Sequence, residues 1–143
     1  MTLTDTGPLV ALIDEDDAHH MECASRVPEL PPPMVSPWPC FTEAMHLLNR
    51  AGGHRAQEKL WNYVTLGALI IHSSSVEEQA RMRELMVKYS NVPMDLADAA
   101  LVAAAEVLGA RRIFSIGSDF YVYRLADGTA LEVVPGLARK SKR

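Results

Sequence analysis

Short apolar runs alternate along the chain with longer segments in which apolar residues recur at helical spacing. Four of the short runs predict β-strands, because each is brief, apolar and bounded by turn-forming or capping residues. They lie at residues 2–4, 34–35, 66–71 and 112–116. A fifth run, at 130–134, predicts a strand at the edge of a sheet. Each of the three segments between the first four strands is expected to form two helices.

Proline, glycine and capping residues set the expected helix boundaries. The helices are expected at residues 8–13, in a stretch ending near 27, and at 37–52, 54–64, 75–89 and 95–108. Ser36 and Pro37 predict a helix cap followed by proline at the first helical position. The Gly52-Gly53 pair is expected to separate the two helices of the second segment, and Gly109 to end the last helix.

The alternation of strands and helices decides the fold class. Strands joined through helices run parallel, since each crossover returns the chain to start the next strand in the same direction. Such a sheet is covered by helices on both faces. The order therefore predicts an α/β fold, a three-layer α/β/α sandwich with a central, mainly parallel sheet of four to five strands.

Length and composition narrow the setting. The chain has 143 residues, 48% of them hydrophobic, which is typical of one domain; we expect it over residues 1–136, followed by a basic tail at 137–143. No apolar run approaches a membrane span and no secretory signal pattern begins the chain, so we expect no membrane association. Cys23 and Cys40 lack metal or redox spacing, which favours a cytoplasmic location.

The charge is unevenly distributed. Fourteen basic and 18 acidic residues give a net charge of −4. Four of the basic residues lie in the last five positions, which leaves ten basic against 18 acidic residues, or −8, for the rest. These four are Arg139, Lys140, Lys142 and Arg143. Such a balance argues against an ordinary basic nucleic-acid-binding module, so the positions of the acids become the main question.

Asp98 is the acid that most needs an explanation. It lies in the segment LADAALVAAAE, on a helix that is apolar on nearly every face. A carboxylate in such surroundings is unfavourable unless it is paired or binds a cation. Asp95 has a simpler explanation as the cap of the same helix, but capping does not account for Asp98 one turn further on.

Three other acids are expected to lie near Asp98. Asp5 and Asp119 follow predicted strands, and Glu43 lies at the border of an apolar helix face. Each could alone be a turn, cap or solvated residue. Because open α/β sheets bind ligands outside the carboxyl ends of their strands, the four acids are together expected to form one site. Carboxylates brought together repel one another unless divalent cations are present, and oxygen ligands suit Mg²⁺ or Mn²⁺.

Other polar clusters receive simpler interpretations. The acids of DEDDAHHM are expected to cap the helix that follows them. His19, His20 and Asp16 could form a second metal site, but helix capping is the favoured explanation. Cys40 has no partnered base, so packing is favoured over a nucleophilic role.

The acids and their surroundings resemble the PIN-domain nucleases, specifically the VapC-type ribonuclease toxins of type II toxin–antitoxin systems. Asp5 in DTGPLVALID is similar to the first acid of the family, Glu43 in FTEAMHLL to the second, and Asp98 in LADAALVAAAE to the third. The segment IFSIGSDFYVYR resembles the final strand and acidic loop, with Asp119 as the fourth acid.

This resemblance implies a metal-dependent endoribonuclease toxin. Asp5, Glu43, Asp98 and Asp119 would hold Mg²⁺ or Mn²⁺ and take part in the hydrolysis of RNA phosphodiester bonds. The resemblance also implies a cognate antitoxin protein as a partner and a homodimer as the assembly.

The last motif departs from the family pattern and leaves a second hypothesis open. Ser115 stands where relatives often have Thr, and Gly117 or Ser118 where they have an acid. The alternative is therefore a catalytically impaired PIN fold that binds RNA or protein. Candidate basic contacts for RNA are the tail and three arginines, Arg111, Arg112 and Arg124. Either Arg111 or Arg112 is expected to cap a helix instead.

Overall fold

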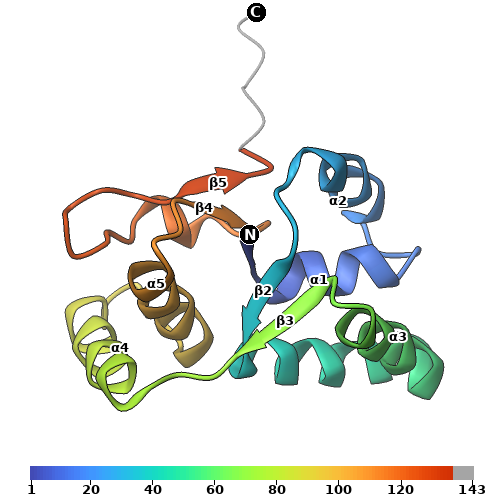
Figure 1. Ribbon diagram of the computed structural model, residues 1–143, viewed down its shortest axis with the longest axis horizontal. Helices are drawn as coiled ribbons and strands as arrows, with labels where there is room; N and C mark the ends of the chain where they lie inside the picture. Colours follow the sequence, from blue (N-terminus) through green and yellow to red (C-terminus); the bar gives the residue numbers. More distant parts are fainter. Residues whose placement is uncertain (137–143) are drawn as a thin grey trace, which may run out of the picture.

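The computed structural model describes residues 1–136 and contains a five-stranded parallel sheet between two layers of helices (Figure 1). The strands are β1 (Thr2–Thr4), β2 (Met34–Pro37), β3 (Leu69–His72), β4 (Arg112–Phe114) and β5 (Glu132–Val134). Their order is β3-β2-β1-β4-β5, and every pairing is parallel. The predicted fold class and the edge position of the fifth strand are confirmed. The predicted basic tail lies outside the described residues.

The strand order places a natural binding position beyond β1. The chain builds β2 and β3 on one side of β1, then crosses to add β4 and β5 on the other side. In the central strand, Leu3 pairs with Val35 of β2 and Ile113 of β4. Parallel sheets bind ligands where the strand order reverses, at the carboxyl ends. Asp5 comes directly after the carboxyl end of β1.

Helices cover both faces of the sheet (Figure 1). On one face lie α4 (Val76–Lys88) and α5 (Leu96–Leu108); on the other lie α1 (Thr6–Ile13), α2 (His20–Arg26) and α3 (Trp38–Thr65). Two short 3₁₀ helices, η1 (Val27–Glu29) and η2 (Asp119–Tyr121), complete the elements. Within residues 1–136, none of the helices is long and apolar enough to cross a membrane.

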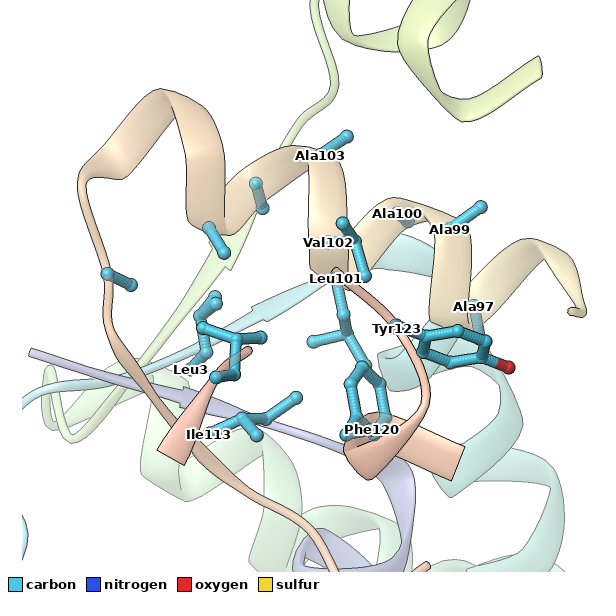
Figure 2. Packing of buried hydrophobic residues seen from close by; sticks show 14 of the residues in the cluster. Leu3, Ala97, Ala99, Ala100, Leu101, Val102, Ala103, Ile113, Phe120 and Tyr123 are labelled. Atoms are coloured by element: carbon cyan, nitrogen blue, oxygen red, sulfur yellow. The ribbon is translucent and has the colours of Figure 1, made fainter. Parts of the chain in front are cut away.

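Helix α5 packs on the sheet and carries buried small side chains on several faces. Leu101 points toward Leu3 and Ile113 and is fully buried, while Ala99 and Ala103 lie on the opposite side of the helix (Figure 2). Alanine side chains let a helix approach a sheet closely because they add little bulk between the two backbones. Truncation of a buried leucine such as Leu101 to alanine typically costs about 2–5 kcal/mol of stability. Asp98 is therefore carried on a firmly anchored helix.

The second predicted helix pair is present as the two parts of α3, which meet at a sharp kink. Gly53 has φ 64° and ψ −155°, a conformation that favours glycine, and it divides α3 as the sequence predicted. The predicted start of this helix was wrong. Ser36 and Pro37 belong to β2, and the fully buried Ser36 hydroxyl donates a hydrogen bond to the Thr4 carbonyl (2.6 Å). Ser36 thus joins two strands, and the helix begins at Trp38.

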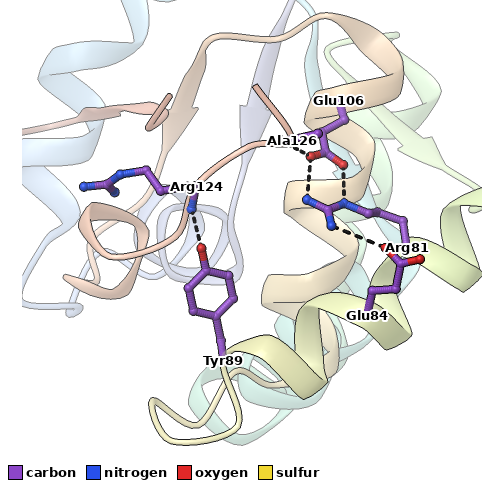
Figure 3. Close-up of polar contacts among 6 residues, drawn as sticks. All are labelled: Arg81, Glu84, Tyr89, Glu106, Arg124 and Ala126. Carbon is purple, nitrogen blue, oxygen red and sulfur yellow. Dashed lines mark hydrogen bonds and ion pairs between the residues drawn. The ribbon is translucent and has the colours of Figure 1, made fainter. Parts of the chain in front are cut away.

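Polar contacts tie α4, α5 and the loop after η2 together (Figure 3). The Arg81 guanidinium donates two hydrogen bonds to the Glu106 carboxylate, at 2.8 and 3.0 Å, and lies 3.5 Å from Glu84. Glu106 also accepts a hydrogen bond from the Ala126 backbone N–H (2.6 Å). Two-point contacts of this kind fix orientation as well as distance. They hold the segment that follows Asp119 against α5.

Contrary to the prediction, the acids at 14–17 do not cap α2. Asp14 Oδ1 accepts from the Asp16 N–H (3.1 Å) and Asp17 Oδ1 from the His19 N–H (2.8 Å), so both stabilise the turns after α1. The N-cap residue of α2 is His19, which makes no side-chain capping bond. His20 is held through its Nδ1 atom, 2.6 Å from the Ala11 carbonyl oxygen.

Candidate functional site

A cleft of about 400 Å³ opens at the carboxyl edge of the sheet, and all four predicted site acids line it. They come from the end of β1, from α3, from α5 and from η2. The acids are Asp5, Glu43, Asp98 and Asp119. The other lining residues are Thr6, Gly7, Val10, Asp17, His19, Leu47, Asp95, Ala97 and Ile116. Segments far apart in the sequence are thus brought together.

Asp5 is held firmly by hydrogen bonds from both sides. Its Oδ1 atom accepts from the Thr6 backbone N–H (2.7 Å), which caps α1, and its Oδ2 atom accepts from the Ser115 hydroxyl (2.9 Å). Burial raises the pKa of this carboxyl above its usual value, and the charges of Asp95 and Glu43 raise it further, against the opposing effect of the two hydrogen bonds. Asp5 is therefore ordered but electrostatically unfavourable without a cation.

Asp98 is in similar surroundings within the same cleft. It lies in the first turn of α5, where its backbone N–H donates to the capping residue Asp95 (2.8 Å). Its own carboxylate accepts a hydrogen bond from the Tyr123 hydroxyl (2.8 Å). Burial raises the pKa of Asp98 to about 7, with further contributions from Asp95, Asp5 and Asp119, while the Tyr123 hydrogen bond lowers it.

Glu43 and Asp119 line the same cleft but are exposed. The Thr6 hydroxyl lies 3.4 Å from Glu43 Oε2 and 3.4 Å from the Cys40 carbonyl oxygen, so its single proton is shared between weak contacts. Within residues 1–136, no hydrogen bond or ion pair reaches the Asp119 carboxylate. These two side chains can therefore rotate within the cleft.

Some residues of the cleft were given other roles or missed in the sequence. Asp95 caps α5 as predicted and also lines the cleft, while Asp17 and His19 reach it from the loop after α1. The sequence marks Ser115 only as standing where relatives often have Thr, but its hydroxyl holds Asp5. Tyr123 was not singled out at all, because a tyrosine after an acidic loop has no distinctive pattern.

The donor set fits a divalent cation. Four carboxylates supply hard oxygen ligands, and the raised pKa values of Asp5 and Asp98 reflect burial and mutual repulsion that a cation would relieve. In their present rotamers, no group of three or more His, Cys, Asp or Glu side chains among residues 1–136 could hold a metal ion. The exposed Glu43 and Asp119 are the acids free to turn toward one.

Cys40 lies behind the acids and is fully buried, with its sulfur 3.9 Å from Asp5 Oδ1. Burial and the nearby Asp5 charge raise the pKa of this thiol far above its usual value. A thiol that stays protonated is a poor nucleophile. Cys40 is thus a packing residue, as the sequence indicated.

The arginines predicted to contact RNA are engaged elsewhere. Arg111 pairs with Asp127 (2.7 Å), and Arg112 lies 3.4 Å from Glu132; neither caps α5, whose C-cap is Gly109. The Arg124 guanidinium donates to the carbonyl oxygens of residues 121, 122 and 123 at 2.7, 3.2 and 3.0 Å. Five other basic side chains in the described part of the chain make no ion pair: Arg50, Arg55 and Lys59 on α3, and Arg83 and Lys88 on α4.

Comparison with known proteins identifies the family. The PIN domain matches residues 2–125, and the chain therefore belongs to the PIN domain family. Its fold is similar to the crystal structure of Mycobacterium tuberculosis VapC20, a toxin that cleaves the sarcin–ricin loop. The TM-score is 0.77 at 22% identity, covering 85% of this chain and 94% of that one.

A toxin–antitoxin complex from Klebsiella pneumoniae is also similar, with a TM-score of 0.63 at 18% identity. The match covers 82% of this chain and 87% of that one. A comparison with curated proteins gave no match. At these identities the two structures establish the fold, and the activity must be argued from the cleft.

Proposed function

We propose that this PIN-domain protein is a Mg²⁺- or Mn²⁺-dependent endoribonuclease toxin that is silenced by a cognate antitoxin. The observation that carries the proposal is the convergence of four carboxylates, from four separate segments, on one cleft at the carboxyl edge of a parallel sheet. Family membership and the likeness to a toxin and to a toxin–antitoxin complex support it.

The chemistry follows from the acids. A divalent cation held by Asp5, Glu43, Asp98 and Asp119 would offset charge on the scissile phosphate and make water a better nucleophile. Thr6 and Ser115 keep Asp5 in one orientation, so a ligand oxygen is in place before binding. Glu43 and Asp119 face solvent and can adjust as the substrate enters.

RNA contacts are proposed along the seam between α1 and α3. Val10 of α1 and Leu47 of α3 line the acidic cleft, and the next turns of the same helices line a second cleft of about 290 Å³. Arg55 and Lys59 lie in that second cleft without an ion-pair partner. Asp14 and its acidic neighbours form the opposite wall, so a phosphate backbone would follow the α3 side.

Two protein partners complete the proposal. A basic segment of an antitoxin would bind the acidic cleft and exclude RNA, consistent with the toxin–antitoxin complex among the similar structures. A homodimer is proposed on α3, where Trp38 and Trp61 are 47% and 43% exposed and both pack edge-on against Phe41. Half-exposed tryptophans on one helix are typical of interface anchors.

The function is tested by RNA cleavage. Purified protein is incubated with end-labelled structured RNAs, including a sarcin–ricin stem-loop, in Mg²⁺, Mn²⁺ or EDTA. We expect metal-dependent cleavage that leaves 5′-phosphate ends and is lost in Asp5→Asn and Asp98→Asn. Cleavage by the wild type no greater than by these variants would contradict the proposal.

One observation favours the alternative of a catalytically impaired binding module. Gly117 and Ser118 supply no carboxylate between β4 and Asp119, so this side of the cleft has one acid. Calorimetric titration with Mn²⁺ separates the two functions. Absence of Mn²⁺ binding, together with RNA binding that a chelator does not change, would favour the module.

A further inference from the structure

The Tyr123 hydroxyl is the one donor to the Asp98 carboxylate among residues 1–136. Tyr123 is 2% exposed, and its hydroxyl donates to Asp98 Oδ2 at 2.8 Å. It reaches Asp98 from a different segment of the chain, just after η2. Figure 2 shows the Tyr123 ring beside α5, near Ala97 and Ala99, with its hydroxyl at the outer end. The other oxygen of Asp98 has no protein donor within the described residues.

The Tyr123 ring is itself held in place. It packs edge-on against Phe120 and Tyr89, with ring centroids 5.3 and 5.1 Å apart. The Tyr89 hydroxyl accepts a hydrogen bond from the Arg124 backbone N–H (2.9 Å), which Figure 3 shows. The Arg124 side chain then binds the carbonyl oxygens of the three preceding residues. The hydroxyl therefore has little freedom to move away from Asp98.

We infer that Tyr123 is a positioning residue for the metal site: its hydroxyl occupies one oxygen of Asp98, restricts rotation of the carboxylate and leaves the other oxygen available to a divalent cation. This inference rests on the proposed metal-dependent function. A neutral donor is suited to this role, since it orders a carboxylate without adding charge to an acidic cleft. Tyr123 acts through Asp98 and does not itself touch the cation or the RNA.

The competing explanation is purely structural. A buried phenol needs a hydrogen-bond acceptor, and the Asp98 carboxylate could satisfy that need without any benefit to metal binding. The two explanations differ in what Tyr123→Phe changes. A positioning role predicts weaker metal binding, whereas a structural role predicts only a change in stability.

The test is calorimetric titration of Mn²⁺ into the wild type, Tyr123→Phe and the matched control Tyr89→Phe. Both variants keep an aromatic ring in the same cluster and lose a hydroxyl, but only Tyr123 contacts an acid of the cleft. Loss of a group that orients a metal ligand typically weakens binding about 10-fold to 100-fold, so we expect at least about a 10-fold weaker Mn²⁺ affinity for Tyr123→Phe. For Tyr89→Phe we expect less than about a 2-fold change, because it has no contact with Asp98.

Two further readouts separate positioning from folding. Melting temperatures of the metal-free proteins are measured for both variants, and titrations are made well below them. RNA cleavage by Tyr123→Phe is expected to recover as the Mn²⁺ concentration is raised, since occupancy of the site is restored. A defect in folding would not recover in this way.

Each outcome decides the inference. If the wild type binds Mn²⁺ and Tyr123→Phe binds it equally well, the positioning role is wrong while the nuclease proposal stands. If Tyr89→Phe weakens binding as much as Tyr123→Phe, the effect comes from the aromatic cluster and the role is again wrong. If the wild type binds no Mn²⁺, both proposals fail together.

Discussion

The two halves of the acidic cleft are built differently. Asp5 and Asp98, which we call the inner acids, are partly buried and accept hydrogen bonds from Thr6, Ser115 and Tyr123. Glu43 and Asp119, the outer acids, are exposed and have weak side-chain contacts or none within residues 1–136. The protein thus orders half of the site in advance and leaves the other half free to adjust.

The difference has an energetic basis. Burial raises the pKa of both inner acids, so holding them ionised destabilises the metal-free fold. The outer acids, in contrast, are exposed to water. Functional sites often retain groups that reduce stability, because the same groups bind the ligand. The inner and outer acids should therefore differ in how neutralisation changes the stability of the metal-free protein.

The largest effect is expected for the inner acids. Asp98→Asn should reduce RNA cleavage by at least about 100-fold, because it removes a ligand charge from the metal site. The same change should raise the melting temperature of the metal-free protein, because a buried charge is removed. Glu77→Gln on the exposed surface of α4 is the control and should change neither quantity. Unchanged cleavage by Asp98→Asn would contradict the assignment.

A smaller effect is expected for the outer acids. Glu43→Gln and Asp119→Asn should each reduce cleavage by about 10-fold, since the ordered inner acids still hold the cation. Their melting temperatures should match the wild type, because both side chains are already exposed to water. A loss of activity greater than that of Asp98→Asn would reverse the proposed division of the cleft.

Substitution of the basic residues along the seam between α1 and α3 should change RNA binding and leave metal binding unchanged. Arg55→Ala and Lys59→Ala should each weaken RNA affinity a few-fold and reduce the salt dependence by about one unit of slope, as expected for one phosphate contact. Mn²⁺ affinity should not change. Arg112→Ala is the control, since that side chain lies near Glu132 on the far edge of the sheet. Equal losses for all three variants would mean that only total charge matters.

The smallest expected effect is a pH dependence of stability carried by Asp98. Its folded-state pKa is raised to about 7, above the value of 3.8 expected for an unfolded chain. As the pH falls from 8 to 5, the folded form takes up a proton that the unfolded form does not, so this group favours folding more at lower pH.

The comparison of wild type with Asp98→Asn isolates that contribution. In metal-free buffer, the Asn variant should be the more stable protein at pH 8, and the difference should shrink toward pH 5. Urea unfolding at several pH values measures it. A difference that stays constant with pH would show that Asp98 has an ordinary pKa.

The fold and the four acids could be predicted because both depend on local patterns. Alternating short apolar runs and helical segments define a parallel α/β sheet, and a carboxylate on an apolar helix such as Asp98 needs a reason to be there. The glycine break at Gly53 followed from backbone sterics alone.

The contacts that could not be predicted from the sequence depend on partners distant along the chain. Arg111 and Arg112 looked available to RNA, but their acidic partners come from the loop and strand that follow. Ser115 holds Asp5 across 110 positions, and no local pattern reveals that contact. Ser36 resembled a helix cap because the Ser-Pro pair is typical of one; its burial beside Thr4 is a property of the assembled sheet.

The alanine-rich face of α5 limits how this protein can change over evolution. Ala99, Ala100 and Ala104 are fully buried, and a larger side chain at any of them would have to displace the helix from the elements packed around it. Asp98 would move with it. Substitutions should therefore accumulate on the outer surface of α4 and at exposed positions such as Val107. The buried alanines of α5 should be the least replaceable residues.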